Sequence, residues 1–138
     1  METTRILLVD DEIALTGLIE KYLLRMGFDV HSVSDSRTAL EQFQKARPPF
    51  QIVIADMSMP YLSGEDLLRE MFRSNTTVRG ILCSGYAVAG TALAREYHGR
   101  IDFLQKPFLP KMLADTVHRL VGANPAADAS QPAASSAS

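Results

Sequence analysis

The chain has 138 residues, of which 46% are hydrophobic and 22% charged, the length and composition of a single globular domain. Its 14 basic and 16 acidic residues leave a net charge of −2, which gives no electrostatic footprint for binding nucleic acid or an anionic membrane. The apolar runs are too short for a membrane span or a signal peptide, and the one cysteine, Cys83, fits a reducing compartment, so we expect a cytoplasmic protein.

Short apolar runs alternate with helical patterns along the chain, as in a parallel sheet with helices on both faces. The five expected strands are residues 5–9, 28–33, 52–56, 78–83 and 101–105. The five expected helices are residues 13–26, 34–46, 63–72, 88–97 and 109–121. The second strand alternates apolar and polar residues, which favours an edge strand half open to water.

Helical spacing also predicts which side chains face the sheet. In the first helix they are Ile13, Leu15, Leu18, Ile19, Tyr22, Leu23 and Met26. In the last helix they are Leu113, Val117, Leu120 and Val121. The helix over residues 88–97 is rich in glycine and alanine, so we expect it to be weakly packed and the most mobile. Residues 122–138 lack periodicity and bulky apolar groups, which predicts a disordered tail.

Polar side chains stand where the expected strands end. Asp10 and Asp11 follow the first strand and Asp56 ends the third, so all three are expected at one edge of the sheet. Crowded carboxylates repel unless a cation or a proton neutralises them, and oxygen ligands favour magnesium over zinc. Ser84 and Lys106, at the ends of the next two strands, supply the hydroxyl donor and positive charge that phosphoryl oxygens require.

Each of these residues also has a purely structural interpretation. Asp10 and Asp11 suit a helix N-terminal cap, Asp56 a turn that ends a strand, and Lys106 a solvated loop. Phe103 fits the core of a short strand. The histidines have no ligand spacing and are expected on the surface: His31, His98 and His118. The cap interpretation loses weight because the acids occur together with the strand-end lysine.

Four motifs at the strand ends resemble one family. They are Leu-Val-Asp-Asp-Glu at 8–12, Ala-Asp-Met-Ser-Met-Pro at 55–60, Leu-Cys-Ser-Gly-Tyr at 82–86 and Phe-Leu-Gln-Lys-Pro-Phe at 103–108. In this order they resemble a CheY-like response-regulator receiver domain of two-component phosphorelay systems, over residues 4–121. The resemblance implies a flavodoxin-like (βα)5 doubly wound parallel sheet with strand order 2-1-3-4-5.

The resemblance also implies the chemistry of the site. Asp56 would accept a phosphoryl group from the phosphohistidine of a sensor histidine kinase or histidine phosphotransfer protein. Asp11, Asp56 and the backbone carbonyl of Ser58 would ligate Mg²⁺, and Asp10 would hold its water shell. The chain would then be a phosphoacceptor switch rather than an enzyme, limited to its own phosphotransfer and autodephosphorylation.

The same resemblance implies a conformational switch. Lys106 would pair with the phosphoryl oxygens, Ser84 would swing to hydrogen-bond them, and Phe103 would follow inward as the aromatic switch. No output module is visible in the sequence, so we expect a downstream protein target on the face of residues 88–121.

Some features leave alternatives open. Thr76 to Gly80 and the pair Gly99-Arg100 depart from the family pattern before the fourth and fifth strands. Ser84 followed by Gly85-Tyr86 resembles receivers of hybrid kinases, so a C-terminal receiver fragment of a hybrid sensor histidine kinase is an alternative origin. A phosphatase of the haloacid dehalogenase type also uses a strand-end aspartate with magnesium, but Ser58 stands where its second acid belongs.

Overall fold

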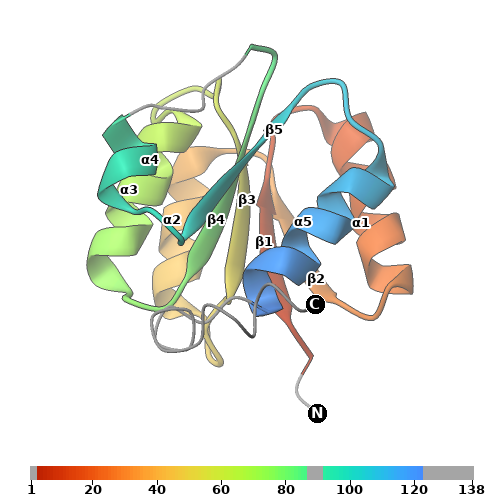
Figure 1. Cartoon of the computed structure of the whole chain (residues 1–138), viewed down its shortest axis with the longest axis horizontal. Helices are drawn as coiled ribbons and strands as arrows, with labels where there is room; N and C mark the ends of the chain where they lie inside the picture. Colours follow the sequence, from red (N-terminus) through yellow and green to blue (C-terminus); the bar gives the residue numbers. More distant parts are fainter. Residues whose placement is uncertain (1–2, 87–91, 123–138) are drawn as a thin grey trace, which may run out of the picture.

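The structure is a computed structural model that describes residues 3–86 and 92–122. The strands are β1 (Arg5–Val9), β2 (Asp29–Val33), β3 (Ile52–Asp56), β4 (Arg79–Ser84) and β5 (Ile101–Gln105). The helices are α1 (Ile13–Arg25), α2 (Ser36–Lys45), α3 (Gly64–Ser74), α4 (Ala92–Glu96) and α5 (Pro110–Gly122). Strands and helices alternate along the chain, as the sequence predicts (Figure 1).

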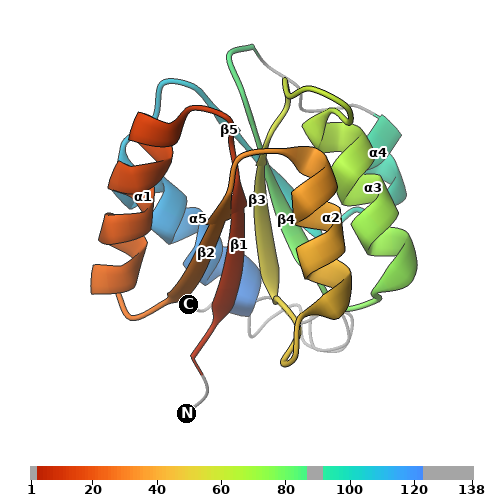
Figure 2. The same ribbon diagram turned by 180° about the vertical axis from the view of Figure 1, so that it is seen from behind.

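All five strands are parallel and lie in the order β2-β1-β3-β4-β5, which confirms the flavodoxin-like fold. Helices α2, α3 and α4 cover one face of the sheet, and α1 and α5 cover the other (Figures 1 and 2). Strand β2 is at an edge, as its alternating pattern predicts. Because β1 and β3 are neighbours near the centre, the segments that follow them emerge side by side at the carboxyl edge.

Between their end residues the central strands carry no charged side chains, because each of their faces packs against helices. In β1, Leu7 and Val9 belong to the cluster beneath α2 and α3, whereas Ile6 and Leu8 belong to the cluster beneath α1 and α5. All four side chains are buried. The alternation follows from the two-residue period of a strand, and burial of each large aliphatic side chain contributes about 1.5–3 kcal/mol.

Several element boundaries differ from the sequence predictions. Strand β4 begins and ends one residue later than expected, and α3 and α5 each extend beyond their expected ends. Helix α2 begins at Ser36 because the carboxylate of Asp35 caps it by accepting from the amide of Thr38 at 2.8 Å. Residues 88–91 of the expected fourth helix and 123–138 of the expected tail lie outside the described part of the chain, and Gly122 still belongs to α5.

The expected inner face of α1 is partly wrong. Ile13 and Leu18 are 75% and 66% exposed, and Met26 is also exposed. The buried residues of the helix are Thr16, Ile19 and Leu23. The seven apolar residues spread beyond one stripe of the helix, and the sheet covers only one stripe. Thr16 can face inward because its hydroxyl donates to the carbonyl of Glu12 at 2.8 Å. Val121, expected inward in α5, is likewise exposed.

Two of the departures from the family pattern are joined by one side chain. The backbone of Gly99 has a φ of +87°, a conformation that glycine adopts without steric cost. The guanidinium of Arg100 then donates to the carbonyls of Asn75 and Val78 at 2.7 and 2.8 Å, which ties the turn before β5 to the approach to β4. None of the described helices is long and apolar enough to cross a membrane.

Candidate functional site

Three carboxylates converge at the carboxyl edge of the sheet. Asp10 follows β1 and Asp56 ends β3, and Val9 is paired with Ala55 in the ladder between these strands. Asp10, Asp11 and Asp56 each offer a carboxylate oxygen, and these atoms lie within 4.8 Å of one another. Asp10 is buried, Asp56 is half-buried and Asp11 is exposed. The predicted clustering of these three carboxylates at one edge of the sheet is therefore present.

Lys106 enters the cluster from the end of β5. Its Nζ lies 3.3 Å from Oδ2 of Asp10, 3.3 Å from Oδ1 of Asp56 and 3.2 Å from Oε1 of Glu12. The Lys106 amide donates to the carbonyl of Ser84 at 2.6 Å, which holds the lysine backbone against the end of β4. In the sequence Glu12 appears only as the last residue of the motif at 8–12, and its ion pair with Lys106 is not predicted, because only the folded arrangement brings the two residues together.

The site carries more negative than positive charge. Burial raises the pKa of Asp56; the ammonium of Lys106 opposes this shift, and the carboxylates of Asp10 and Asp11 add to it. Burial alone would lower the pKa of Lys106, but Asp10, Glu12 and Asp56 outweigh it and raise the pKa above its ordinary value. Asp10, Asp11 and Asp56 form an oxygen-rich, anionic donor set, and such a set fits a hard divalent cation.

The two predicted switch residues lie on adjacent strands. Ser84 ends β4 and is buried, and its hydroxyl oxygen accepts from the amide of Tyr86 at 3.1 Å. Phe103 lies in β5, paired in register with Leu82, and its half-buried ring packs against the core cluster beneath α2 and α3. The structure thus places Ser84 at the same edge as the carboxylates, and Phe103 two positions further from that edge.

The loop after β3 carries Ser58, which is exposed. This loop is anchored at both ends, because the Met57 amide donates to the carbonyl of Cys83 at 2.7 Å and the Gly64 amide donates to the carbonyl of Met57 at 2.9 Å. At Gly64 a Cβ atom would overlap the backbone oxygen of Asp56 and lie 2.7 Å from Cδ1 of Leu82. The absence of a side chain there lets α3 begin directly against the end of β3.

The remaining candidates are structural. Cys83 is buried and paired in register with Asp56, and burial raises the pKa of its thiol to about 12, so the reactive thiolate is not formed at neutral pH. His31, His98 and His118 are exposed, as predicted.

A doubly wound parallel sheet with carboxylates and a lysine gathered at its carboxyl edge defines a flavodoxin-like protein with an acidic site at that edge. The family described as the response regulator receiver domain matches residues 6–118 of the chain. The chain belongs to this family, whose members are the phosphoacceptor switch domains of two-component systems.

Comparisons with individual proteins agree with this assignment. The chain is 34% identical over 116 residues to the sensor kinase CckA of Brucella abortus and 35% identical over 104 residues to the regulatory protein AtoC of Escherichia coli. These alignments cover 84% and 75% of this chain but only 12% and 22% of those proteins. The chemotaxis protein CheY of Thermotoga maritima is 25% identical, with 96% of its length covered.

Among solved structures, the receiver domain of a response regulator from Clostridium thermocellum matches with a TM-score of 0.76 and 29% identity. The match covers 86% of this chain and 94% of that one. The receiver domain of a LuxO repressor protein from Vibrio parahaemolyticus matches with a TM-score of 0.74 and 27% identity, covering 86% of this chain and 90% of that one.

Proposed function

We propose that Asp56 takes a phosphoryl group from the phosphohistidine of a sensor histidine kinase or a histidine phosphotransfer protein, and that phosphorylation switches the binding of a downstream protein. The observation that carries this proposal is the convergence of Asp10, Asp11 and Asp56 with Lys106 at one edge of the sheet. Receiver-family membership supports the same assignment.

In the proposed transfer, a carboxylate oxygen of Asp56 attacks phosphorus, and the bond from phosphorus to the histidine nitrogen breaks with its electron pair returning to the ring. Mg²⁺, held by Asp11, Asp56 and the backbone carbonyl of Ser58 with Asp10 on its water shell, would neutralise the charge gathered on the oxygens. Lys106 already lies 3.3 Å from Oδ1 of Asp56, so its ammonium can contact a phosphoryl oxygen bound to that carboxylate after a small movement.

The switch uses residues on β4 and β5. New acceptor oxygens on Asp56 would draw the hydroxyl of Ser84 away from the Tyr86 amide and leave room for Phe103 to move inward. The neighbouring face, from residue 92 through α5, would present the changed surface to the downstream target. Lys111, Asp115 and His118 are exposed on α5 and supply a polar rim suited to transient association.

The donor protein must approach Asp56 from the carboxyl edge. Ile13 begins α1 two residues after Asp11 and is 75% exposed, and Leu109 follows Lys106 by three residues and is 67% exposed. Large apolar side chains exposed in the segments that follow β1 and β5 support a protein phosphodonor rather than a small molecule alone. The similarity to part of a sensor kinase keeps open that the chain is the receiver of a hybrid kinase.

The deciding experiment is intact-mass spectrometry after incubation with acetyl phosphate, with and without Mg²⁺. The wild-type chain should gain one phosphoryl group in a Mg²⁺-dependent manner, and Asp56→Asn should gain none. Asp115→Asn is the matched control, because this exposed aspartate lies on α5 and pairs with Lys111. Absence of the gain in wild type, or its persistence in Asp56→Asn, would overturn the proposal.

A further inference from the structure

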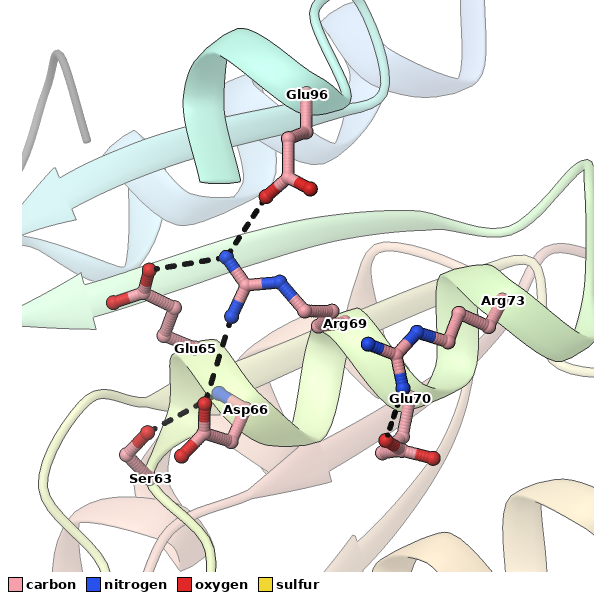
Figure 3. Close-up of polar contacts among 7 residues, drawn as sticks. All are labelled: Ser63, Glu65, Asp66, Arg69, Glu70, Arg73 and Glu96. Carbon is pink, nitrogen blue, oxygen red and sulfur yellow. Dashed lines mark hydrogen bonds and ion pairs between the residues drawn. The ribbon is translucent and has the colours of Figure 1, made fainter. Parts of the chain in front are cut away.

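An ion pair joins α3 to α4. Arg69 of α3 donates through Nη2 to Oε1 of Glu96 at 2.9 Å, across the space between the two helices (Figure 3). Apolar contacts act beside it, because Leu93 is fully buried and the rings of Tyr97 and Phe72 lie 4.8 Å apart. Helix α4 is therefore attached to α3 by both a polar and an apolar contact.

The same Arg69 guanidinium also pairs with the first turn of its own helix, with Glu65 through Nη2 and with Asp66 through Nη1. The guanidinium lies 3.4 Å from Oε2 of Glu65 and 3.5 Å from Oδ1 of Asp66 (Figure 3). That first turn starts where the loop after Asp56 ends, since Gly64 is hydrogen-bonded to Met57. Arg69 thus connects the turn nearest the phosphoacceptor strand with the helix that follows β4, the strand of Ser84.

Helix α4 depends on such contacts for its position. The described part of this helix is Ala92–Glu96, and within it Leu93 is the buried residue. A shift of α4 relative to α3 would separate Arg69 from Glu96. The pair of Arg73 with Glu70, 2.8 Å apart within α3, would survive the same shift.

We propose that the ion pair between Arg69 and Glu96 is a latch that stabilises the present arrangement of α4, in which the Ser84 hydroxyl accepts from the Tyr86 amide, against the arrangement that a phosphoryl group on Asp56 favours. This latch rests on the proposed phosphoacceptor function. It adds a residue pair that biases the equilibrium between the two arrangements of α4. The carboxylate of Glu96 is 51% exposed, and exposed ion pairs contribute little free energy. Loss of the latch therefore changes the equilibrium constant between the two arrangements of α4 by roughly two- to five-fold.

The test uses Glu96→Gln, which leaves Glu65 and Asp66 in place around Arg69. Glu70→Gln is the matched control, because Glu70 has a similar exposure of 47% and also pairs with an arginine of α3. The affinity for beryllofluoride, a phosphoryl mimic, is measured with Mg²⁺ by following backbone amide signals in NMR spectra. Glu96→Gln should bind roughly two- to five-fold more tightly than wild type, and Glu70→Gln should match wild type.

Salt and amide exchange provide independent readouts. The difference between Glu96→Gln and wild type should shrink in about 1 M salt, where charges are screened within about 3 Å. Without the mimic, amides of α4 should exchange faster in Glu96→Gln than in Glu70→Gln. Equal or weaker binding by Glu96→Gln would overturn the latch. Failure of the wild type itself to bind beryllofluoride would instead refute the phosphoacceptor function. Equal amide exchange of α4 in Glu96→Gln and Glu70→Gln would show that the ion pair between Arg69 and Glu96 does not restrain α4.

Discussion

Asp56 lies in a position where its ionised form lowers the stability of the folded chain. Burial and the neighbouring carboxylates raise its pKa, so its ionised form is less favourable in the folded chain than in the unfolded one. Between the ordinary pKa of this carboxyl group and its raised pKa in the folded chain, the folded state binds more protons than the unfolded state. The contribution of Asp56 to stability therefore falls as pH rises through this window, and the cost persists at neutral pH.

We therefore expect Asp56→Asn to raise the free energy of unfolding at pH 7 without metal by about 0.5–2 kcal/mol, the usual size for a stabilising substitution. Urea denaturation at pH 7 and at pH 4.5 measures this effect, and the gain should be smaller at the lower pH. Asp115→Asn serves as a control on an exposed helix face. If Asp56→Asn were less stable than wild type at pH 7, the interpretation that excess negative charge at the site lowers stability would be wrong.

Asp11 should matter for the cation because its carboxylate belongs to the cluster while remaining exposed to solvent. Asp11→Ala should weaken Mg²⁺ binding roughly ten-fold or more, as expected when a metal-site residue is removed. Glu41→Ala, an exposed acid on α2, should leave the affinity unchanged. Isothermal titration calorimetry distinguishes the two, and equal affinities would refute the assignment of the metal site.

At the scale of elements, Lys106 should couple the phosphoacceptor to β4 and β5. The Lys106→Ala variant should still accept some phosphoryl group on Asp56. Its conformational change should be smaller, because the ion pair between Lys106 and the phosphoryl group, which favours the phosphorylated arrangement, is lost. Amide chemical shifts of residues 92–105, recorded with and without phosphorylation, report the change. Shifts as large as those of wild type would contradict this role.

The packing of α3 against β3 depends on the missing side chain at Gly64. Gly64→Ala should lower the free energy of unfolding by about 1–3 kcal/mol, because its Cβ meets backbone and Leu82 atoms that cannot easily move. Gly17→Ala is the matched control, since a Cβ in that helix meets no atom within 4 Å, and it should stabilise by up to about 1 kcal/mol. Urea denaturation gives both values, and similar effects at the two sites would disprove the packing argument.

At the scale of the whole molecule, the conformational change should extend from the cluster of Asp10, Asp11 and Asp56 to β4, α4 and β5. Hydrogen exchange measured with and without beryllofluoride should change most over residues 84–105, because Ser84 and Phe103 belong to this stretch and Leu93 is the buried residue of α4 within Ala92–Glu96. The control region is α1. The largest change at residues 15–26, with the later segment unaffected, would show that the output face is wrongly placed.

Local sequence patterns determined the elements of this protein and the chemistry at their ends. Apolar runs and helical spacing predicted five strands and five helices because burial on one or two faces dictates the period of a segment. Asp10, Asp56 and Lys106 could be placed at one edge because parallel strands end on the same side of a sheet. The strand order came from the resemblance of the motifs, since spacing alone does not define which strands are neighbours.

Only the tertiary structure decided which side chains meet across elements. Ile13 and Leu18 read as core but are exposed, because the sheet covers a narrower stripe of α1 than its apolar residues occupy. Glu12 reaches Lys106 across 94 positions of sequence separation, and Arg69 reaches Glu96 across 27. Such contacts depend on the relative placement of whole elements, and a local pattern carries no information about a partner that the fold brings near from elsewhere.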